Sequence, residues 1–260
     1  GLLGWLIGYR HYLQREAGDM SLYRIPGGGG RMCEAIAAKL ARPVKFHHPL
    51  TAVRTNEDGV RLEFVKASDV FDRAVICLPV SVLPSIHWPG GVAAAKGEAW
   101  PRLGTARAIK IALRFRTRFW EGTGWSGRML ADRPFQQIWD GGQAGAAVLC
   151  AYICGDDAEQ ILKEADPVQA CLQALVAVVP ESESEFIDGQ VHDWIGDRWS
   201  RGAFSSLAPG SVFAALPHLA RPVGAVHFGG EATASWMGFI EGALESAERI
   251  REEIANANVV

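Results

Sequence analysis

The fold of this 260-residue chain is decided near its C-terminal end, by the stretch FGGEATASWMGFIEGA at residues 228–243. A short apolar run ends at Phe228, and two glycines and the acid Glu231 follow it. After a turn, the spacing of the apolar residues predicts a long amphipathic helix from about Gly238 to Ala255. A strand, a glycine turn and a helix N-terminus suit a dinucleotide, because glycines let the backbone approach a ligand and the helix offers free N–H groups.

This stretch resembles the C-terminal flavin-binding segment of the flavin-containing amine oxidases, a family of monoamine, polyamine and L-amino acid oxidases. The resemblance implies FAD as the cofactor. It implies that the carboxylate of Glu231 accepts hydrogen bonds from hydroxyl groups of the cofactor. The cofactor-binding positions that it implies in this stretch are Gly230, Glu231, Phe239, Ile240 and Ala243. Taken alone, Gly-Gly-Glu before a helix would be an ordinary loop and a capped helix.

A second segment, VHDWIGDRWSRGAFSSLAPG at residues 191–210, resembles the family's pattern of Trp, Ser-x-Gly, an aromatic residue and Pro-Gly. The resemblance implies that Trp194 packs beside the flavin. It also implies that Phe204 and Phe239 form the two aromatic walls of the substrate path, with Gly238 in the same cavity. Taken alone, both phenylalanines would be core residues, which is the usual environment of Phe.

This segment also departs from the monoamine oxidases. Those enzymes tether their flavin through a Cys at the position where this chain has Ala203. FAD is therefore expected to bind noncovalently. Both expected walls are Phe where monoamine oxidases have Tyr, so the slot between them lacks hydroxyl groups.

The residue implied in catalysis lies in an alternating strand at residues 106–115. Its odd-numbered apolar residues from Ile109 to Phe115 share one face, which places Lys110 on the other. The family carries a Lys in such a strand, followed by a Phe-Trp pair that Phe119 and Trp120 match. The resemblance implies that Lys110 holds a water molecule against the flavin N5 atom. The alternative is a solvent-facing lysine on an edge strand.

The rest of the chain predicts short elements in the order that the family has. Helices are expected at residues 2–16, 31–40, 92–98 and 168–179, strands at residues 44–46, 50–55, 60–65, 73–79 and 147–153, and a turn at residues 139–145. The family's backbone contact to adenine falls on Leu50. The glycine loop at residues 26–30 is not a phosphate fingerprint, because the acid expected about 20 residues further on is missing.

These elements predict an α/β fold of mixed α+β type. The resemblance implies that it contains an incomplete Rossmann-like FAD-binding domain and a mixed-sheet substrate domain flanked by helices. Residues 1–22 are expected to form a helical segment of the substrate domain, and residues 23–85 part of the FAD-binding domain. Residues 86–190 are expected to form the substrate domain. Residues 191–260 are expected to return to the FAD-binding domain and to end in the flavin helix.

Composition excludes some other classes of function. The formal net charge of −3 provides no basic surface for nucleic acid, and no apolar run is long enough to span a bilayer. The five cysteines form no CxxC pair, and no metal site is expected. Cys77 and Cys150 lie in apolar runs and are expected to be buried. This cysteine usage favours a reducing compartment, hence a cytoplasmic protein.

The chain lacks one part of the family's pattern, the βαβ unit with GxGxxG and a ribose-binding acid. It also lacks an initiator Met, so we expect a processed product or a separately encoded subunit. A second chain is expected to carry the ADP-binding half in a heteromer, which a symmetric pairing would double. The implied activity is oxidation of an amine or L-amino acid, with hydride transfer from the substrate α-carbon to flavin N5 and an imine as product.

Two alternatives from other classes stay open at this point. One is a non-catalytic subunit that completes the fold of a partner flavoprotein. The other is an oxidoreductase of the flavin desaturase type, against which Lys110 and the paired phenylalanines argue.

Overall fold

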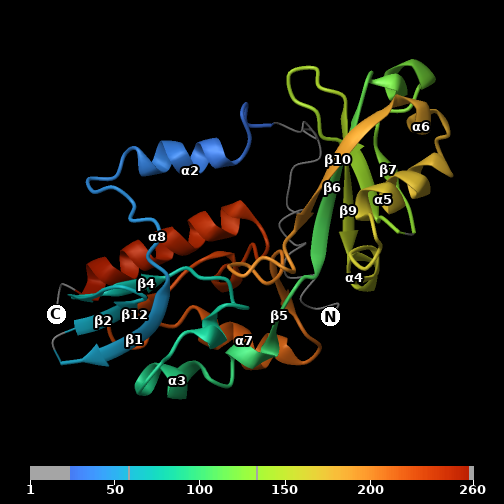
Figure 1. Cartoon of the computed structure of the whole chain (residues 1–260). Helices are drawn as coiled ribbons and strands as arrows, with labels where there is room; N and C mark the ends of the chain where they lie inside the picture. Colours follow the sequence, from blue (N-terminus) through green and yellow to red (C-terminus); the bar gives the residue numbers. More distant parts are fainter. Residues whose placement is uncertain (1–23, 58, 133, 258–260) are drawn as a thin grey trace, which may run out of the picture. The chain divides into compact units, whose positions relative to one another are not determined.

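The computed structural model describes residues 24–57, 59–132 and 134–257, which divide into two compact units (Figure 1). Of these residues, unit 1 comprises 24, 32–105 and 204–257, and unit 2 comprises 25–31 and 106–203. The units therefore change at residues 105 and 203, later than the boundaries expected at residues 85 and 190. The helix expected at residues 2–16 and the segment 1–22 lie outside the described residues.

Unit 1 combines three small sheets with helices. Its helices are α3 (Gly91–Lys96), α7 (Ser211–Leu219) and α8 (Ile240–Ala257), with short 3-10 turns at Leu83–Ser85, Trp100–Arg102 and Glu231–Thr233. Helix α2 (Gly30–Ala37) begins in unit 2 and belongs to unit 1 from Met32 onward. Its strands are β1 (Leu50–Asn56), β2 (Gly59–Phe64), β3 (Ser68–Phe71), β4 (Ala74–Ile76), β5 (Leu103–Thr105), β11 (Ser205–Leu207) and β12 (Val226–Phe228). Strands β1, β2 and β3 form an antiparallel sheet, β5 pairs with β11 antiparallel, and β4 pairs with β12 in parallel.

The first sheet of unit 1 depends on a glycine. Gly59 begins β2 opposite Asn56, with φ at +132°, a conformation that L side chains rarely adopt. A Cβ at this position would lie 2.3 Å from the carbonyl oxygen of Phe71, so the hairpin and the added strand β3 close only with glycine there. Strand β3 was not expected from the sequence. The strand expected at residues 44–46 is wrong: these residues are exposed coil, and Phe46 is 74% exposed.

The parallel pair of β4 and β12 is the part of unit 1 that most resembles a dinucleotide domain. Ala74, Ile76, Val226 and Phe228 are buried in one apolar core with Trp88 and Trp100. Helix α8 runs beside this pair (Figure 1). Gly229, directly after β12, allows this approach, because a Cβ there would lie 2.8 Å from Ile250 Cδ1 and 2.9 Å from Cys77 Sγ.

Unit 2 is a five-stranded antiparallel sheet with helices on one face. Its strands are β6 (Ala108–Phe115), β7 (Met129–Leu130), β8 (Gln137–Asp140), β9 (Val148–Cys154) and β10 (Phe186–Asp193), in the order β10-β6-β9-β8-β7. Its helices are α4 (Asp156–Ile161), α5 (Pro167–Val176) and α6 (Glu181–Glu185), with a 3-10 turn at Phe119–Thr123. All its strand pairs are antiparallel, whereas a mixed sheet was expected.

The alternation expected in β6 is confirmed. Ile109, Ile111, Leu113 and Phe115 are buried in the core of unit 2, on the face that α4 and α5 cover. The strand is central, because β10 pairs on one side of it and β9 on the other. The turn expected at residues 139–145 begins later, since Trp139 and Asp140 belong to β8.

Two cysteines differ from the expectation of burial. Cys77 is exposed at the end of β4, because this strand is buried on one face only. Cys150 is half-buried, since it lies opposite Trp139 and Ala112 on the face of the unit 2 sheet away from the core.

Within the described ranges, no helix combines the length and the apolar character needed to cross a membrane.

Candidate flavin and substrate site

The carboxylate of Glu231 joins two segments that the sequence analysis assigned to the same site. Its Oε1 atom accepts hydrogen bonds from the backbone N–H of Ser205 (3.0 Å) and from the Ser205 hydroxyl (2.6 Å). Its Oε2 atom accepts a bond from the backbone N–H of Gly238 (2.6 Å). The strand that follows Phe204 and the turn that precedes α8 are thereby fixed to one side chain within unit 1. An ionised carboxylate has about four acceptor positions, so one stays open for another donor.

Phe204 and Gly238 lie against each other in this arrangement. Gly238 has φ at +86°, and a Cβ built on it would lie 3.4 Å from Phe204 Cδ2, so the ring of Phe204 covers the glycine. Phe239 follows directly, and its ring centroid lies 5.6 Å from that of Trp236. Phe204 is 39% exposed and Phe239 47% exposed, so neither is a core residue.

The start of α8 presents apolar side chains beside free backbone donors. Ile240 is 57% exposed and Leu244 is 44% exposed, so apolar surface is accessible at the start of this helix of 18 residues. The first N–H groups of a helix have no acceptor within it. Gly242 is required here, because a Cβ would lie 2.1 Å from the carbonyl oxygen of Trp236. Ala243, in the first turn, is half-buried.

Gly230 leaves open space over the turn. It has φ at +94°, and the nearest atom to a Cβ built there would be the carbonyl oxygen of Cys77 at 3.8 Å. A flat and largely apolar ring system fits such a setting: an open glycine, exposed Phe239 and Ile240, and free N–H groups. The residues of unit 1 therefore fit a flavin on these observations.

A buried lysine anchors the helix that precedes β12. Lys96, at the end of α3, is 1% exposed, and its ammonium group donates to the backbone carbonyls of His218, Leu219 and Arg221. It also lies 4.3 Å from the centroid of the Phe228 ring. Burial, followed by the charges of Arg221 and Arg249, lowers the pKa of Lys96 to about 8, with Glu253 opposing the shift.

Lys110 lies on the open face of the unit 2 sheet. It is exposed, and it pairs across the strands with His192 of β10 and Tyr152 of β9. Its ammonium nitrogen lies 5.7 Å from the centroid of the Trp139 ring. Burial, and then Cys154, raises the pKa of Tyr152 to about 12, so this hydroxyl stays protonated at neutral pH.

Trp194 and Lys110 have a common neighbour, His192. The rings of His192 and Trp194 have centroids 3.9 Å apart, and His192 is the cross-strand partner of Lys110. The backbone carbonyl of Trp194 accepts from the N–H of Gly202 (2.7 Å), which closes the loop between them. Lys110 and Trp194, the two expected site residues in unit 2, thus each have His192 as a neighbour.

Leu50 is the remaining expected residue. It begins β1, opposite Phe64, and packs against the unit 1 core to which Phe228 and Ala232 belong. The structure gives it no contact with the Glu231 cluster.

Comparison with known proteins decides the family. Residues 6–254 match the model of the family described as flavin containing amine oxidoreductase. The chain belongs to this family. Among its curated relatives is a putative L-amino-acid oxidase, YobN of Bacillus subtilis, which is 27% identical over 89% of this chain and 52% of its own length. The flavin-containing amine oxidase A of Equus caballus is 24% identical over 89% of this chain and 46% of its own length.

A solved structure supports the fold of this amine oxidoreductase chain. A putrescine oxidase bound to putrescine superposes with a TM-score of 0.83 at 21% identity, over 90% of this chain and 54% of the other. The resemblance proposed from the sequence, the α/β fold and a flavin as cofactor are thereby confirmed. The chain spans about half the length of the relatives that it matches.

Sequence reasoning missed several residues of these clusters. His192 was not among the expected site residues, yet it is exposed beside Lys110. Tyr152 lies between residues 121 and 190, where no site residue was assigned, and the register of β6 and β9 places it beside Lys110. Ser205 is the third: it lies one residue beyond an expected wall, but only the folded chain shows its two bonds to Glu231. Among the residues that the structure describes, no group of three His, Cys, Asp or Glu could hold a metal ion.

Proposed function

We propose that this chain supplies the isoalloxazine side of an FAD site, and much of the substrate cavity, of an amine or L-amino acid oxidase. The observation that carries the proposal is the Glu231 cluster, in which one carboxylate holds Ser205 and Gly238 beside the open start of α8. These are the segments that resemble the family's flavin and substrate residues. The relatives named above, an L-amino-acid oxidase and an amine oxidase, support both substrate classes.

The proposed roles of individual residues are those that the family resemblance implies. Glu231, Gly230, Ile240 and Ala243 would hold the cofactor, together with Leu50 through its backbone and Trp194. FAD, when bound, would supply the redox chemistry, which is the acceptance of a hydride from the substrate α-carbon; the imine product would then be hydrolysed by water. Phe204 and Phe239 would orient an uncharged amine and exclude water from it.

Lys110 would hold a water molecule near the reacting atoms. The ammonium group is exposed on an open sheet face and makes no hydrogen bond to another described residue, so its donors are available. Tyr152 and His192, its neighbours in the sheet, could limit how that water is oriented.

The cofactor is proposed to bind without a covalent bond. Ala203 offers no sulfur at the position where a thioether forms in the monoamine oxidases. Acid precipitation of the purified flavoprotein should therefore release all flavin into the supernatant. A precipitate that keeps its yellow colour would contradict this part of the proposal.

We also propose that the ADP-binding half of the site comes from outside these 260 residues, on a second chain. Helix α2 buries none of its residues, and several apolar side chains on it and after it are exposed, namely Ile36, Leu40, Val44 and Phe46. Soluble monomers rarely leave such a strip uncovered. The relatives are about twice as long as the region that they share with this chain.

One experiment tests both the proposed oxidase activity and the proposed second chain. The complete complex that contains this chain should be isolated, examined by native mass spectrometry with FAD, and mixed anaerobically with a panel of amines and L-amino acids. The proposal expects a stoichiometric heteromer whose visible flavin absorbance is bleached by at least one substrate. A lone 28.1 kDa chain that holds FAD tightly would overturn the partnership. A flavoprotein that no amine or amino acid reduces would favour a non-catalytic subunit.

A further inference from the structure

The glycine turn between β12 and α8 is held from behind by an arginine of α8. Arg249 donates from Nη2 to the backbone carbonyl of Phe228 (2.8 Å) and to the hydroxyl of Thr233 (3.1 Å). These acceptors stand at the two ends of the turn. The Thr233 hydroxyl in turn donates to the carbonyl of Gly230 (2.9 Å). One guanidinium group therefore fixes both ends of the turn and, through Thr233, its centre.

A serine of the same helix holds the middle of the turn. The backbone N–H of Gly230 donates to the hydroxyl of Ser246 (3.0 Å), and that hydroxyl donates to the carbonyl of Ala243 (2.7 Å). Ser246 is 2% exposed. Its hydroxyl would lie 3.5 Å from a Cβ at Gly229, so the turn and the helix are in direct contact here.

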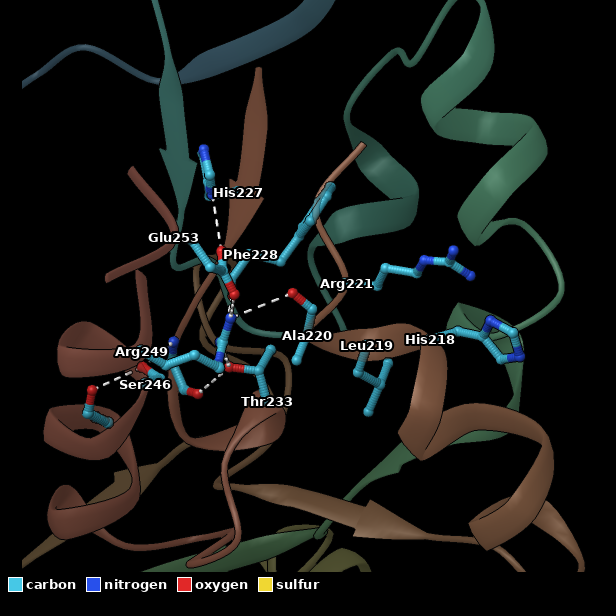
Figure 2. A network of polar contacts seen from close by, with 12 residues as sticks. His218, Leu219, Ala220, Arg221, His227, Phe228, Thr233, Ser246, Arg249 and Glu253 are labelled. Atoms are coloured by element: carbon cyan, nitrogen blue, oxygen red, sulfur yellow. Dashed lines mark hydrogen bonds and ion pairs between the residues drawn. The ribbon is translucent and has the colours of Figure 1, made fainter. Parts of the chain in front are cut away.

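Arg249 is itself oriented by a carboxylate and a histidine. Glu253, one helical turn further along α8, accepts from Arg249 Nη1 (2.5 Å) and lies 2.8 Å from His227 Nδ1 (Figure 2). Although burial opposes it, the bonds from His227 and Arg249 lower the pKa of Glu253, so this carboxylate stays ionised at neutral pH. Figure 2 shows Arg249 at the centre of the network, with contacts toward Ala220, Thr233 and Glu253.

We propose that Arg249 and Ser246 are positioning residues for the flavin: they hold the Gly229–Thr233 turn from α8 in the shape that presents Glu231 and the Gly230 backbone to the cofactor. Both bind the turn from the helix side. Glu231 points to Ser205 and Gly238 instead. The two residues would thus act on the cofactor only through the turn. This inference rests on the proposed function, since it presumes that the turn receives FAD.

The physical reason is the conformation of the turn. Gly230 has φ at +94°, which the backbone adopts as one of several accessible states of glycine. Two glycines in succession have little preference for one conformation, so hydrogen bonds from outside must select it. Without Arg249 the ends of the turn lose two bonds, and FAD must then order the turn as it binds, which weakens apparent affinity.

Lys96 provides a matched control. Lys96 is buried and Arg249 is half-buried, and both cations bind the C-terminal end of α7. Lys96 donates to the carbonyls of His218, Leu219 and Arg221, and Arg249 donates to the carbonyl of Ala220 (3.3 Å). Lys96 donates no hydrogen bond to the turn of residues 229–233. Its removal should destabilise the unit without loosening the turn.

The test is made on the complete flavoprotein with four variants, Arg249→Met, Arg249→Lys, Ser246→Ala and Lys96→Met. Three quantities are measured: the thermal midpoint of the apoprotein, the FAD dissociation constant by flavin fluorescence, and the visible circular dichroism of bound flavin. We expect Arg249→Met to weaken FAD binding about tenfold or more and Ser246→Ala by about three- to tenfold, with altered dichroism. Arg249→Lys, which keeps a charged donor, should recover part of the loss.

Lys96→Met should lower the thermal midpoint but leave the FAD dissociation constant within about twofold of the original. Equal loss of FAD affinity in Arg249→Met and Lys96→Met at equal loss of stability would overturn the inference, because the role would then be structural only. Unchanged FAD affinity in Arg249→Met and in Ser246→Ala would overturn it as well. If Arg249→Met does not fold, Ser246→Ala and Arg249→Lys decide in the same way. Failure of the unaltered flavoprotein to bind FAD would instead refute the proposed function, and this inference with it.

Discussion

The turn after β12 and the open face around Lys110 use polar side chains in opposite ways. In the turn, Glu231 receives three hydrogen bonds from its own chain, and Arg249 and Ser246 fix the backbone from behind. On the open face, Lys110 is exposed, and its ammonium group lies over the Trp139 ring without a hydrogen bond to another described residue. Under the proposed function, this difference would divide the roles: side chains already bonded within the protein would build the site, and Lys110 would act on what binds there.

The strongest test of this division is Lys110→Met. Because the side chain holds no other part of unit 2, fold and flavin content should stay unchanged, while turnover or flavin reoxidation falls by about a hundredfold or more. Rapid-mixing absorbance of flavin reduction and reoxidation measures the effect. Arg114→Met, on the same face of β6 but paired with the exposed Asp188, is the control and should change the rates little. Equal rates in the original protein and Lys110→Met would remove Lys110 from the mechanism.

The buried Lys96 can be tested through the pH dependence of the free energy of unfolding. Its pKa in the folded protein is about 8, against an ordinary value of 10.5 in the unfolded chain. Between these values the unfolded chain binds more protons, so the free energy of unfolding rises with pH, by about 3 kcal/mol across the window.

Urea unfolding of the original protein and of Lys96→Met, at intervals from pH 7.5 to 10.5, measures this contribution as the difference between the two. The rise should be absent in the variant. The same pH dependence in both proteins would show that Lys96 titrates normally.

Glu231→Gln tests whether Glu231 acts on FAD binding or on the rate of the reaction. The amide keeps one acceptor oxygen but turns an N–H₂ group toward donors, because both carboxylate oxygens accept bonds. The loss of about 1.5–3 kcal/mol should weaken FAD binding roughly ten- to a hundredfold, more than it slows the chemistry. Titration with FAD and single-turnover reduction separate the two effects. Glu241→Gln is the control, since Glu241 is exposed and has no partner among the described residues. A collapse of turnover at unchanged FAD affinity would give Glu231 another role.

The smallest expected effect concerns packing under the turn. Gly229→Ala places a methyl group 2.8 Å from Ile250 Cδ1 and 2.9 Å from Cys77 Sγ, so these side chains must move. The expected loss of stability is about 1–3 kcal/mol. Gly29→Ala is the control, because a Cβ there meets no atom within 4 Å. Chemical denaturation of both variants measures the difference in stability. Equal stability would mean that the turn and its neighbours can shift to accommodate the added methyl group.

Sequence patterns predicted some parts of this molecule well. The helix expected from about Gly238 to Ala255 is present as α8, and the alternation in β6 is confirmed, because both carry a strong periodicity. Strand β3 was missed since all four of its residues are exposed and no burial pattern marks them. Residues 44–46 have the apolar character of a strand, but they find no strand to pair with among the described residues.

The candidate site was predictable only where a motif carried it. Glu231, Phe204 and Gly238 could be named from the resemblance, and the structure brings them together. Ser205 and Arg249 could not, because their roles depend on contacts 26 and 21 residues away in sequence. Tyr152 depends on strand register, which a single sequence does not specify across a long connection.

The parallel pairing of β4 with β12 also has a consequence for how the chain is made. Residues 74–76 cannot pair until residues 226–228 have been synthesised, and the loop closed by that pairing contains all of residues 106–203. The antiparallel sheet of unit 2 uses much nearer neighbours, and its last strand ends at Asp193. Contacts of long sequence separation form slowly. Unit 2 can therefore fold on the ribosome before β4 and β12 of unit 1 are able to pair. The apolar face of β4 then stays exposed longest, and that interval is when chaperones would be needed most.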